Sequence, residues 1–234
     1  MWQLEQTLPH NLAKLEENCD LVLLDYQSPD GLRDYIFNNF QAELSSGKLK
    51  YFRLEHDYNY TSSYAKNVAH KLATGEVLFN LDGDNRIYEG LITELRDLKH
   101  HQFFLPRLHG NDEGSYGRLG YTRRTFHMLG GYDETIVGMK GDDGALRVTA
   151  RQHRLRPVHA KQIVVAIQNT REQKDLYVNM PGKSNPPIYP DRYGVADVTD
   201  HLGNMFSIWS SKKELPRELF FFFIFPCHSD QDTM

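Results

Sequence analysis

The sequence predicts an α/β protein in which helices flank a mostly parallel sheet. Two runs, at 21–24 and 77–79, are continuously apolar, which is typical of strands buried on both faces. Segments with helical spacing of apolar residues follow the strands, so that strands and helices alternate through residue 99. The chain has 234 residues, of which 40% are hydrophobic and 25% charged. This composition supports one sizeable core and excludes a disordered chain and a multispan membrane protein.

The first elements follow from local patterns. Residues 2–17 carry apolar side chains near helical spacing, although Pro9 disfavours a single undisturbed helix there. A buried strand is expected at 19–26. Ser28 is a plausible N-cap, and it should begin a helix that runs to about Leu44.

The remaining elements are assigned in the same way. We expect strands at 50–54, 77–81, 103–108, 116–121 and 163–167, and helices at 61–73, 88–99 and 142–153. Beyond about residue 170, prolines among polar residues predict loop or tail. We therefore expect one domain at 1–175 and an extension at 176–234. The apolar run at 219–225 is either an element packed on the core or an exposed patch.

Charge and cysteine content exclude several classes of protein. The chain has 27 Lys and Arg against 31 Asp and Glu, without a basic block, so nucleic acid is not an expected partner. The two cysteines, Cys19 and Cys227, lie at opposite ends of the chain, which excludes a disulfide scaffold and a cysteine-rich zinc site. No signal peptide or membrane-spanning run is recognisable, so we expect a cytoplasmic protein, unless a truncated N-terminus has lost a signal or anchor.

An acidic loop follows the strand expected at 77–81. In open parallel α/β sheets, ligands bind beyond the carboxyl ends of the strands, where Asp82 and Asp84 lie. Two carboxylates on such a loop can hold Mg²⁺ or Mn²⁺. The alternative is a strand-terminating turn with capping carboxylates. The same triplet recurs at 230–232, in a tail with no strand before it, so the pattern alone is weak.

A second acidic pair, Asp142 and Asp143, begins an expected helix after a glycine-rich bend at Gly130 and Gly131. The helix dipole favours ionised carboxylates at this end. An ionised carboxylate near a substrate hydroxyl is what a general base requires. Capping of the helix is the alternative. Adjacent carboxylates point about 100° apart on a helix, so one can cap while the other faces a ligand.

Four ordered motifs resemble those of nucleotide-sugar glycosyltransferases of the GT-A fold, family 2 type. They lie at 21–31, 64–76, 77–85 and 130–143. The last is similar to a galactosyltransferase signature, Gly-Gly-Phe-Asp-Glu followed by Gly-Trp-Gly-Gly-Glu-Asp. The resemblance covers roughly residues 2–175. It implies a metal-dependent, inverting enzyme that moves a hexose from a nucleotide sugar to a hydroxyl of a saccharide or another acceptor. UDP-linked galactose, glucose or their N-acetyl forms are the implied donors.

The resemblance also implies roles for individual residues. Nucleotide-sugar contacts fall on Asp25, Lys66, Asn67 and Asp82; ligands of Mn²⁺ or Mg²⁺ fall on Asp82, Asp84 and Asn169; catalytic roles fall on Asp143 as general base and on Asp142 as a partner of acceptor hydroxyls. The loop residues Arg171 and Lys174 either face the diphosphate or are simply solvated.

The chain departs from the family pattern in several places, one of which is Asn169, at the nearest match to a position where the family often has a metal-binding His. Family members usually open with a strand before the first helix, whereas this chain starts in the helix, so the first strand is expected to be missing. Met139 stands where the family often has Trp, and Asp142 replaces the usual Glu. Two alternatives therefore stay open: a non-catalytic or truncated remnant that binds a saccharide or a partner, and a metal-dependent nucleotidyltransferase that uses Asp82 and Asp84.

Overall fold

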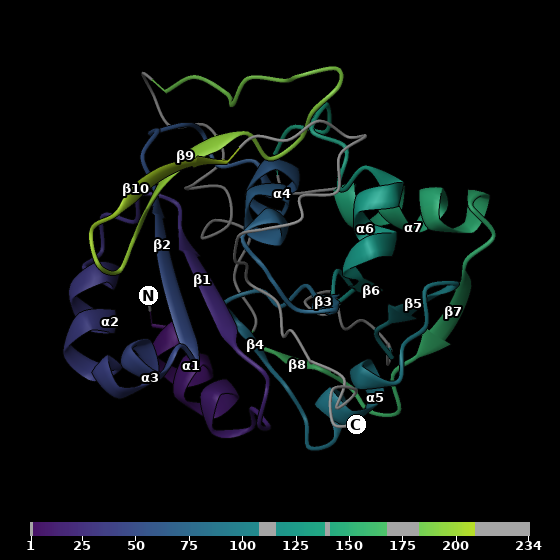
Figure 1. The fold of residues 1–234 in the computed structure, drawn as a ribbon, viewed down its shortest axis with the longest axis horizontal. Coiled ribbons are helices and arrows are strands. Elements are labelled where there is room, and N and C mark those ends of the chain that lie inside the picture. Colours follow the sequence, from purple (N-terminus) through teal and green to yellow (C-terminus); the bar gives the residue numbers. More distant parts are fainter. Residues whose placement is uncertain (1, 108–115, 139–140, 168–182, 209–234) are drawn as a thin grey trace, which may run out of the picture.

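The α/β class is confirmed. The computed structural model describes residues 2–107, 116–138, 141–167 and 183–208. In chain order these contain α1 (Leu4–Ala13), β1 (Leu21–Asp25), α2 (Leu32–Asn39), α3 (Gln41–Ser46), β2 (Leu49–Leu54), α4 (Ser62–Lys71), β3 (Val77–Phe79), β4 (Asn85–Arg86), α5 (Leu91–Arg96), β5 (Gln102–Leu105), β6 (Gly120–Thr122), α6 (Arg123–Leu129), α7 (Asp142–Gln152), β7 (Arg156–His159), β8 (Val165–Ala166), β9 (Ala196–Asp200) and β10 (Met205–Ile208). Figure 1 shows two strand groups with α4 between them.

The first sheet has the order β1-β2-β9-β10. Strands β1 and β2 are parallel, with Leu21 opposite Leu49, and β9 runs antiparallel to β2. The expectation of loop or tail beyond about residue 170 is therefore wrong for β9 and β10. These strands are short and lie after a proline-rich stretch, so no extended apolar run marks them. The domain boundary at 175/176 stays a prediction.

The second sheet has the order β3-β6-β5-β7, and β4 pairs separately with β8. The sheets are mixed rather than mostly parallel, since only β1–β2 and β5–β7 among the described pairs are parallel. Strand β6 runs antiparallel to both β3 and β5, and β9 runs antiparallel to both β2 and β10.

Two helices differ from the sequence prediction. The helix expected from Ser28 begins instead at Leu32, with Gly31 at the N-cap in a left-handed conformation. The backbone N–H of Ser28 donates to Oδ1 of Asp25 at 2.7 Å, which closes a turn after β1 and leaves Ser28 outside the helix.

Helix α1 contains Pro9 within it, and this residue is exposed, so water can satisfy the carbonyl that the ring leaves unpaired.

Helix α6 and strand β7 were missing from the prediction. Helix α6 has Thr122 as its N-cap, whose side chain accepts from the N–H of Thr125, and Gly130 ends it in a left-handed conformation. It is only 7 residues long, which is too short to display helical periodicity. Strand β7 is mostly exposed and contains a proline, so it lacks the apolar alternation of a recognisable strand.

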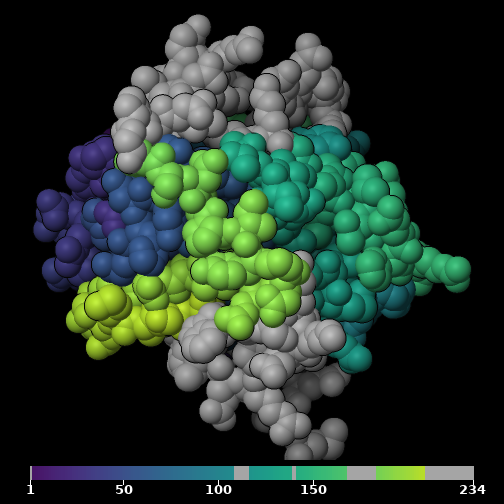
Figure 2. All heavy atoms as spheres, turned by 90° about the horizontal axis from the view of Figure 1, so that it is seen from above, coloured from purple at the N-terminus to yellow at the C-terminus, as the bar shows by residue number. Residues whose placement is uncertain are grey.

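Helix α4 lies in the middle of the molecule, between the two strand groups (Figure 1). All ten of its residues are buried, including several polar and charged ones. Buried polar groups require partners, so this helix is expected to organise polar contacts with its surroundings. Figure 2 shows the segment 183–208 crossing from the blue N-terminal part to the teal part of the chain. No helix in the described ranges is long and apolar enough to span a bilayer.

Candidate functional site

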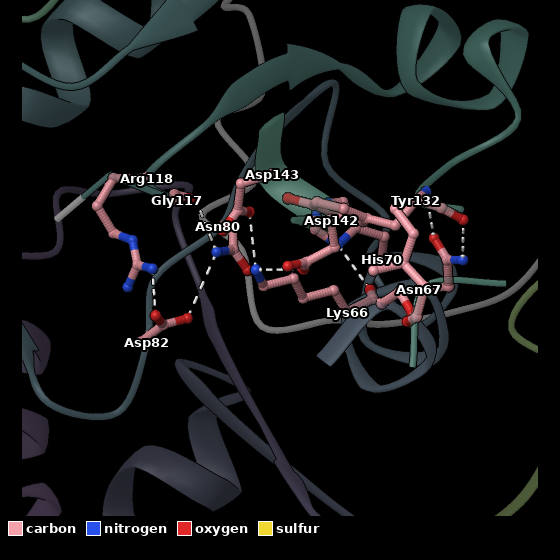
Figure 3. Close-up of polar contacts among 12 residues, drawn as sticks. Lys66, Asn67, His70, Asn80, Asp82, Gly117, Arg118, Tyr132, Asp142 and Asp143 are labelled. Carbon is pink, nitrogen blue, oxygen red and sulfur yellow. Dashed lines mark hydrogen bonds and ion pairs between the residues drawn. The ribbon is translucent and has the colours of Figure 1, made fainter. Parts of the chain in front are cut away.

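The centre of the site is an ammonium group shared by two carboxylates. Lys66, on α4, lies with its Nζ 2.8 Å from Oδ2 of Asp142 and 2.7 Å from Oδ1 of Asp143 (Figure 3). The same Nζ lies 5.1 Å from the ring centroid of Tyr132. The second acidic pair predicted from the sequence is therefore fixed by a residue that lies 76 positions earlier than Asp142 in the chain.

The two carboxylates differ in exposure. The side chain of Asp142 is 2% exposed, whereas that of Asp143 is 18% exposed. Burial raises the pKa of Asp143, and the charges of Asp142 and Asp82 raise it further, against the opposing effect of Lys66. Burial lowers the pKa of Lys66, but Asp143, Asp82 and Asp142 together outweigh it, so that the net pKa is raised and the ammonium stays charged.

Helix capping does not explain this acidic pair. The N-cap of α7 is Gly141, which makes no side-chain cap hydrogen bond, and both carboxylates that follow it accept hydrogen bonds from Lys66. Asp142 and Asp143 lie in the first turn, where the helix dipole still favours negative charge. Because Asp142 is buried beside Lys66, Asp143 is the carboxylate of this pair that keeps a solvent-exposed part and that a ligand can reach.

The acidic loop after β3 is held by α1 and by a buried arginine. The hydroxyl of Thr7 donates to the carbonyl of Gly83 at 2.6 Å, and Nδ2 of Asn11 donates to the carbonyl of Asn85 at 2.8 Å. Arg118 pairs with the carboxylate of Asp82. The loop is therefore anchored on both sides.

Asp82 and Asp84 have different surroundings. The side chain of Asp82 is 45% exposed and that of its partner Arg118 is 3% exposed. Burial raises the pKa of Asp82, but the charges of Arg118 and Lys66 lower it more, so the carboxyl has a net lowered pKa. Asp84 accepts a hydrogen bond of 2.7 Å from Nδ2 of Asn85.

A short chain of contacts joins the two acidic positions (Figure 3). Nδ2 of Asn80 donates to the carbonyl of Gly117 at 2.9 Å and lies 3.5 Å from Oδ1 of Asp82. Gly117 in turn lies against Asp143: a Cβ added to Gly117 would be 2.7 Å from Cγ of that residue. The structure thus brings together Asp82, Asp142 and Asp143, which are distant in sequence.

Asn67 holds the glycine-rich signature loop. It donates from Nδ2 to the carbonyl of Tyr132 and accepts at Oδ1 from the N–H of Tyr132, both at 2.8 Å. The same Nδ2 donates to Oε1 of Glu134, which also accepts from the N–H of Gly194 at 2.6 Å. A Cβ on Gly131 would be 2.5 Å from Oδ1 of Asn67, so only glycine fits there. Asn67 therefore serves the loop structure directly.

Asp25 is fully buried in this structure. Its Oδ2 accepts from the hydroxyl of Tyr51 at 2.5 Å and lies 3.6 Å from Nη1 of Arg53, while Oδ1 accepts from the N–H of Ser28. These partners shape the turn after β1. The predicted contacts of Asp25, Lys66 and Asn67 with a nucleotide stay predictions.

The predicted metal site is only partly within the described residues. Asn169 lies outside them, as do Met139, Arg171 and Lys174. Across the described ranges, no group of three or more His, Cys, Asp or Glu side chains is arranged to hold a metal ion. Asp82 is already paired with Arg118. The described residues therefore supply two of the three predicted ligands, Asp82 and Asp84, and Asp82 is shared with Arg118.

Several residues that shape the site were not recognised in the sequence. Arg118, Asn80 and Glu134 are the main ones, and all three are buried. Asn80 and Glu134 belong to the quoted motifs, but their partners are far away in the chain. A buried arginine next to an acidic loop has no local sequence signal, because its partner Asp82 is 36 residues distant.

No protein-family model matches the chain, and no curated protein does either. Among solved structures, a mutant of Drosophila β1,4-galactosyltransferase 7 in complex with manganese, UDP-galactose and xylobiose is 13% identical, with a TM-score of 0.42, over 82% of this chain and 92% of that one. The catalytic domain of the Drosophila enzyme in complex with xylobiose is 12% identical, with a TM-score of 0.42, over 81% and 91%. At this level of similarity, the likeness assigns no residue role and no substrate to the present chain.

Proposed function

We propose that the chain is a GT-A-like glycosyltransferase that uses a nucleotide sugar, with Asp143 as its general base. The observation that carries this proposal is that Lys66 holds Asp143 at 2.7 Å while 18% of the Asp143 side chain stays exposed. A carboxylate that is fixed and still reachable can take a proton from a bound hydroxyl. Its raised pKa, caused by burial and by the neighbouring carboxylates, makes it a stronger base than an ordinary aspartate.

The proposed step is a single displacement. The acceptor oxygen bonds to the anomeric carbon while the bond from that carbon to the diphosphate oxygen breaks. The acceptor proton passes to Asp143 and then to solvent, and a nucleoside diphosphate leaves. Attack from the face opposite the leaving group inverts the configuration, through a transition state with oxocarbenium character.

The other residues take supporting roles in this proposal. Asp142 is buried, so it would orient Lys66 rather than contact the acceptor. Asp25 and Asn67 are also buried, and would hold the loops around the donor. Mn²⁺ or Mg²⁺, if bound, would be held by Asp84 with Asn169, and would supply positive charge to the leaving diphosphate. The donor class that we propose is a UDP-linked hexose, and the acceptor is a hydroxyl of a saccharide or of another molecule.

The first test is ligand binding. The thermal midpoint of the full chain would be measured with UDP, GDP, CMP and ATP, each with and without Mn²⁺, because a ligand that binds only the folded state raises the midpoint. A rise with UDP is expected. A rise with ATP alone, followed by turnover of nucleoside triphosphates, would favour the nucleotidyltransferase alternative.

The second test is turnover. Release of UDP from UDP-galactose, UDP-glucose and their N-acetyl forms would be measured against a panel of saccharides for the wild type, Asp143→Asn and Asp191→Asn. Asp191 is an exposed aspartate outside the acidic cluster and serves as the matched control. We expect Asp143→Asn to lose roughly a hundredfold or more of the rate and Asp191→Asn to keep it. Equal rates in both variants would contradict the role of Asp143. Nucleotide binding without turnover on any acceptor would favour the non-catalytic remnant.

A further inference from the structure

Arg118 occupies a position that the sequence pattern does not predict. It follows Gly117 and lies just before β6, with a side chain that is 3% exposed. Its Nη2 donates to Oδ2 of Asp82, and its Nη1 donates to Oδ1 of Asn85. Asn85 donates in turn to Oδ1 of Asp84 at 2.7 Å. One guanidinium therefore contacts the first carboxylate of the acidic loop directly and the second through an amide.

The charge of Arg118 is permanent. Arginine cannot release its proton under ordinary conditions. Burial lowers the pKa of Arg118, but Asp82 and Asp143 together outweigh it, so the net pKa is raised. A divalent cation at Asp82 would lie beside this fixed positive charge and would also compete with it for Oδ2 of the carboxylate. The charge of Lys66 also lowers the pKa of Asp82, so a second positive charge acts on this carboxylate.

We infer that Arg118 is a built-in counter-ion that removes Asp82 from the set of metal ligands and makes the acidic loop a weak site for divalent cations. Asp82 is then a structural partner of a buried arginine, and Arg118 determines the cation preference of the loop. A divalent ion would have to be held by Asp84 with groups other than Asp82. This inference does not rest on the proposed glycosyl transfer, since it concerns only which cation the Asp82 carboxylate binds.

In the test, Mn²⁺ is titrated into the protein in the absence of nucleotide. The electron paramagnetic resonance signal of the free ion is measured at each step and gives the amount of bound Mn²⁺. Four forms of the full chain are compared: the wild type, Asp82→Asn, Arg118→Gln and the double variant Arg118→Gln/Asp82→Asn. Glutamine at 118 keeps an amide that can bond to Asn85, without the charge. Circular dichroism and the thermal midpoint establish that each form is folded.

We expect Arg118→Gln to bind Mn²⁺ at least about tenfold more tightly than the wild type, and the double variant to lose this gain, because the freed carboxylate of Asp82 is its source. Asp82→Asn alone should leave Mn²⁺ affinity unchanged and lower the thermal midpoint, because it leaves Arg118 buried without its carboxylate.

Two results would overturn the inference. One is a loss of about tenfold or more in Mn²⁺ affinity on Asp82→Asn in the wild-type background, which would make Asp82 a metal ligand despite Arg118. The other is a folded Arg118→Gln variant that binds Mn²⁺ no more tightly than the wild type. If Arg118→Gln does not fold, the comparison of wild type with Asp82→Asn decides the question by itself. Failure of glycosyl transfer would leave these outcomes untouched, because no sugar or nucleotide is present.

Discussion

The backbone of Gly117 lies directly against the carboxylate of Asp143. A Cβ at Gly117 would be 2.7 Å from Cγ of Asp143, closer than side-chain carbons pack. The carbonyl of Gly117 also accepts the hydrogen bond from Asn80 that links this point to the acidic loop. The carboxylate of Asp143, the proposed general base, is thus held on one side by Lys66. On the other side it fits only because residue 117 is a glycine.

Gly117→Ala should impair the site more than the fold. The added methyl group would push the Asp143 carboxylate away from its position, so we expect turnover to fall about tenfold or more, with a small change in thermal midpoint. Gly144→Ala is the matched control, since a Cβ there meets nothing within 4 Å and alanine favours a helix. An alanine at 117 that leaves turnover intact would show that Asp143 has room to move without consequence.

Removal of the shared ammonium should destabilise the protein in a pH-dependent way. Lys66→Met leaves Asp142 and Asp143 buried without their cation, at a cost of roughly 3–5 kcal/mol in the free energy of unfolding near neutral pH. The variant keeps the burial that raises the pKa of Asp143 but lacks the opposing charge of Lys66. Its folded state binds more protons, and the deficit should shrink as the pH falls toward about 5.

Urea unfolding of the Lys66→Met variant at about pH 7 and pH 5 checks this expectation. Lys14→Met is the control, because Lys14 pairs with Glu89 at the surface, where the carboxylate side chain is 87% exposed. That variant should lose less than about 1 kcal/mol at either pH. A deficit of Lys66→Met that does not depend on pH would count against a charge-based cause.

Gly194 is required by its packing on α4. A Cβ there would lie 2.7 Å from the backbone carbon of Asn67, and the φ of Gly194 is +56°. Gly203 also has a positive φ, of +86°, but a Cβ there meets nothing within 4 Å. We therefore expect Gly203→Ala to cost only about 1–2 kcal/mol for the backbone conformation and Gly194→Ala to cost distinctly more. Equal losses in chemical unfolding would mean that the segment can shift away from α4.

His127 should make the fold sensitive to mild acid. Burial, followed by the charges of Arg123 and Lys71, lowers the pKa of His127 to about 4, and its Nδ1 lies 2.5 Å from the hydroxyl of Tyr193. The unfolded chain binds a proton at an ordinary histidine pKa of about 6.5. Between these two values the unfolded state holds more protons, so stability falls as the pH falls, by about 3 kcal/mol at most.

The measurement is the thermal midpoint of the wild type and His127→Gln from about pH 7 to pH 4. The glutamine variant should show a shallower decline. The buried His70, whose pKa is also lowered mainly by burial, contributes in the same direction and remains in the variant. Parallel curves for the two proteins would remove His127 from this explanation.

Much of the element order could be predicted because it depends on local patterns. The apolar runs at β1 and β3 are continuous, and both are buried strands in the structure. Helix α7 begins at Asp142, as its acidic first turn predicted. Strands β9 and β10 could not be recognised, because β9 joins the sheet by pairing with β2, more than 140 residues earlier in the chain, and β10 joins it only through β9.

The candidate site divides in the same way. The sequence by itself determined which carboxylates lie at strand and helix ends, since strand ends and helix first turns are local features of Asp82, Asp84, Asp142 and Asp143. Only the tertiary structure decided which cation each of them meets. Lys66 and Arg118 reach their partners across 76 and 36 residues of chain, and Lys66 does so from the buried helix α4. Contacts at such separations depend on how the sheets and α4 pack together, so no local pattern of residues can specify them.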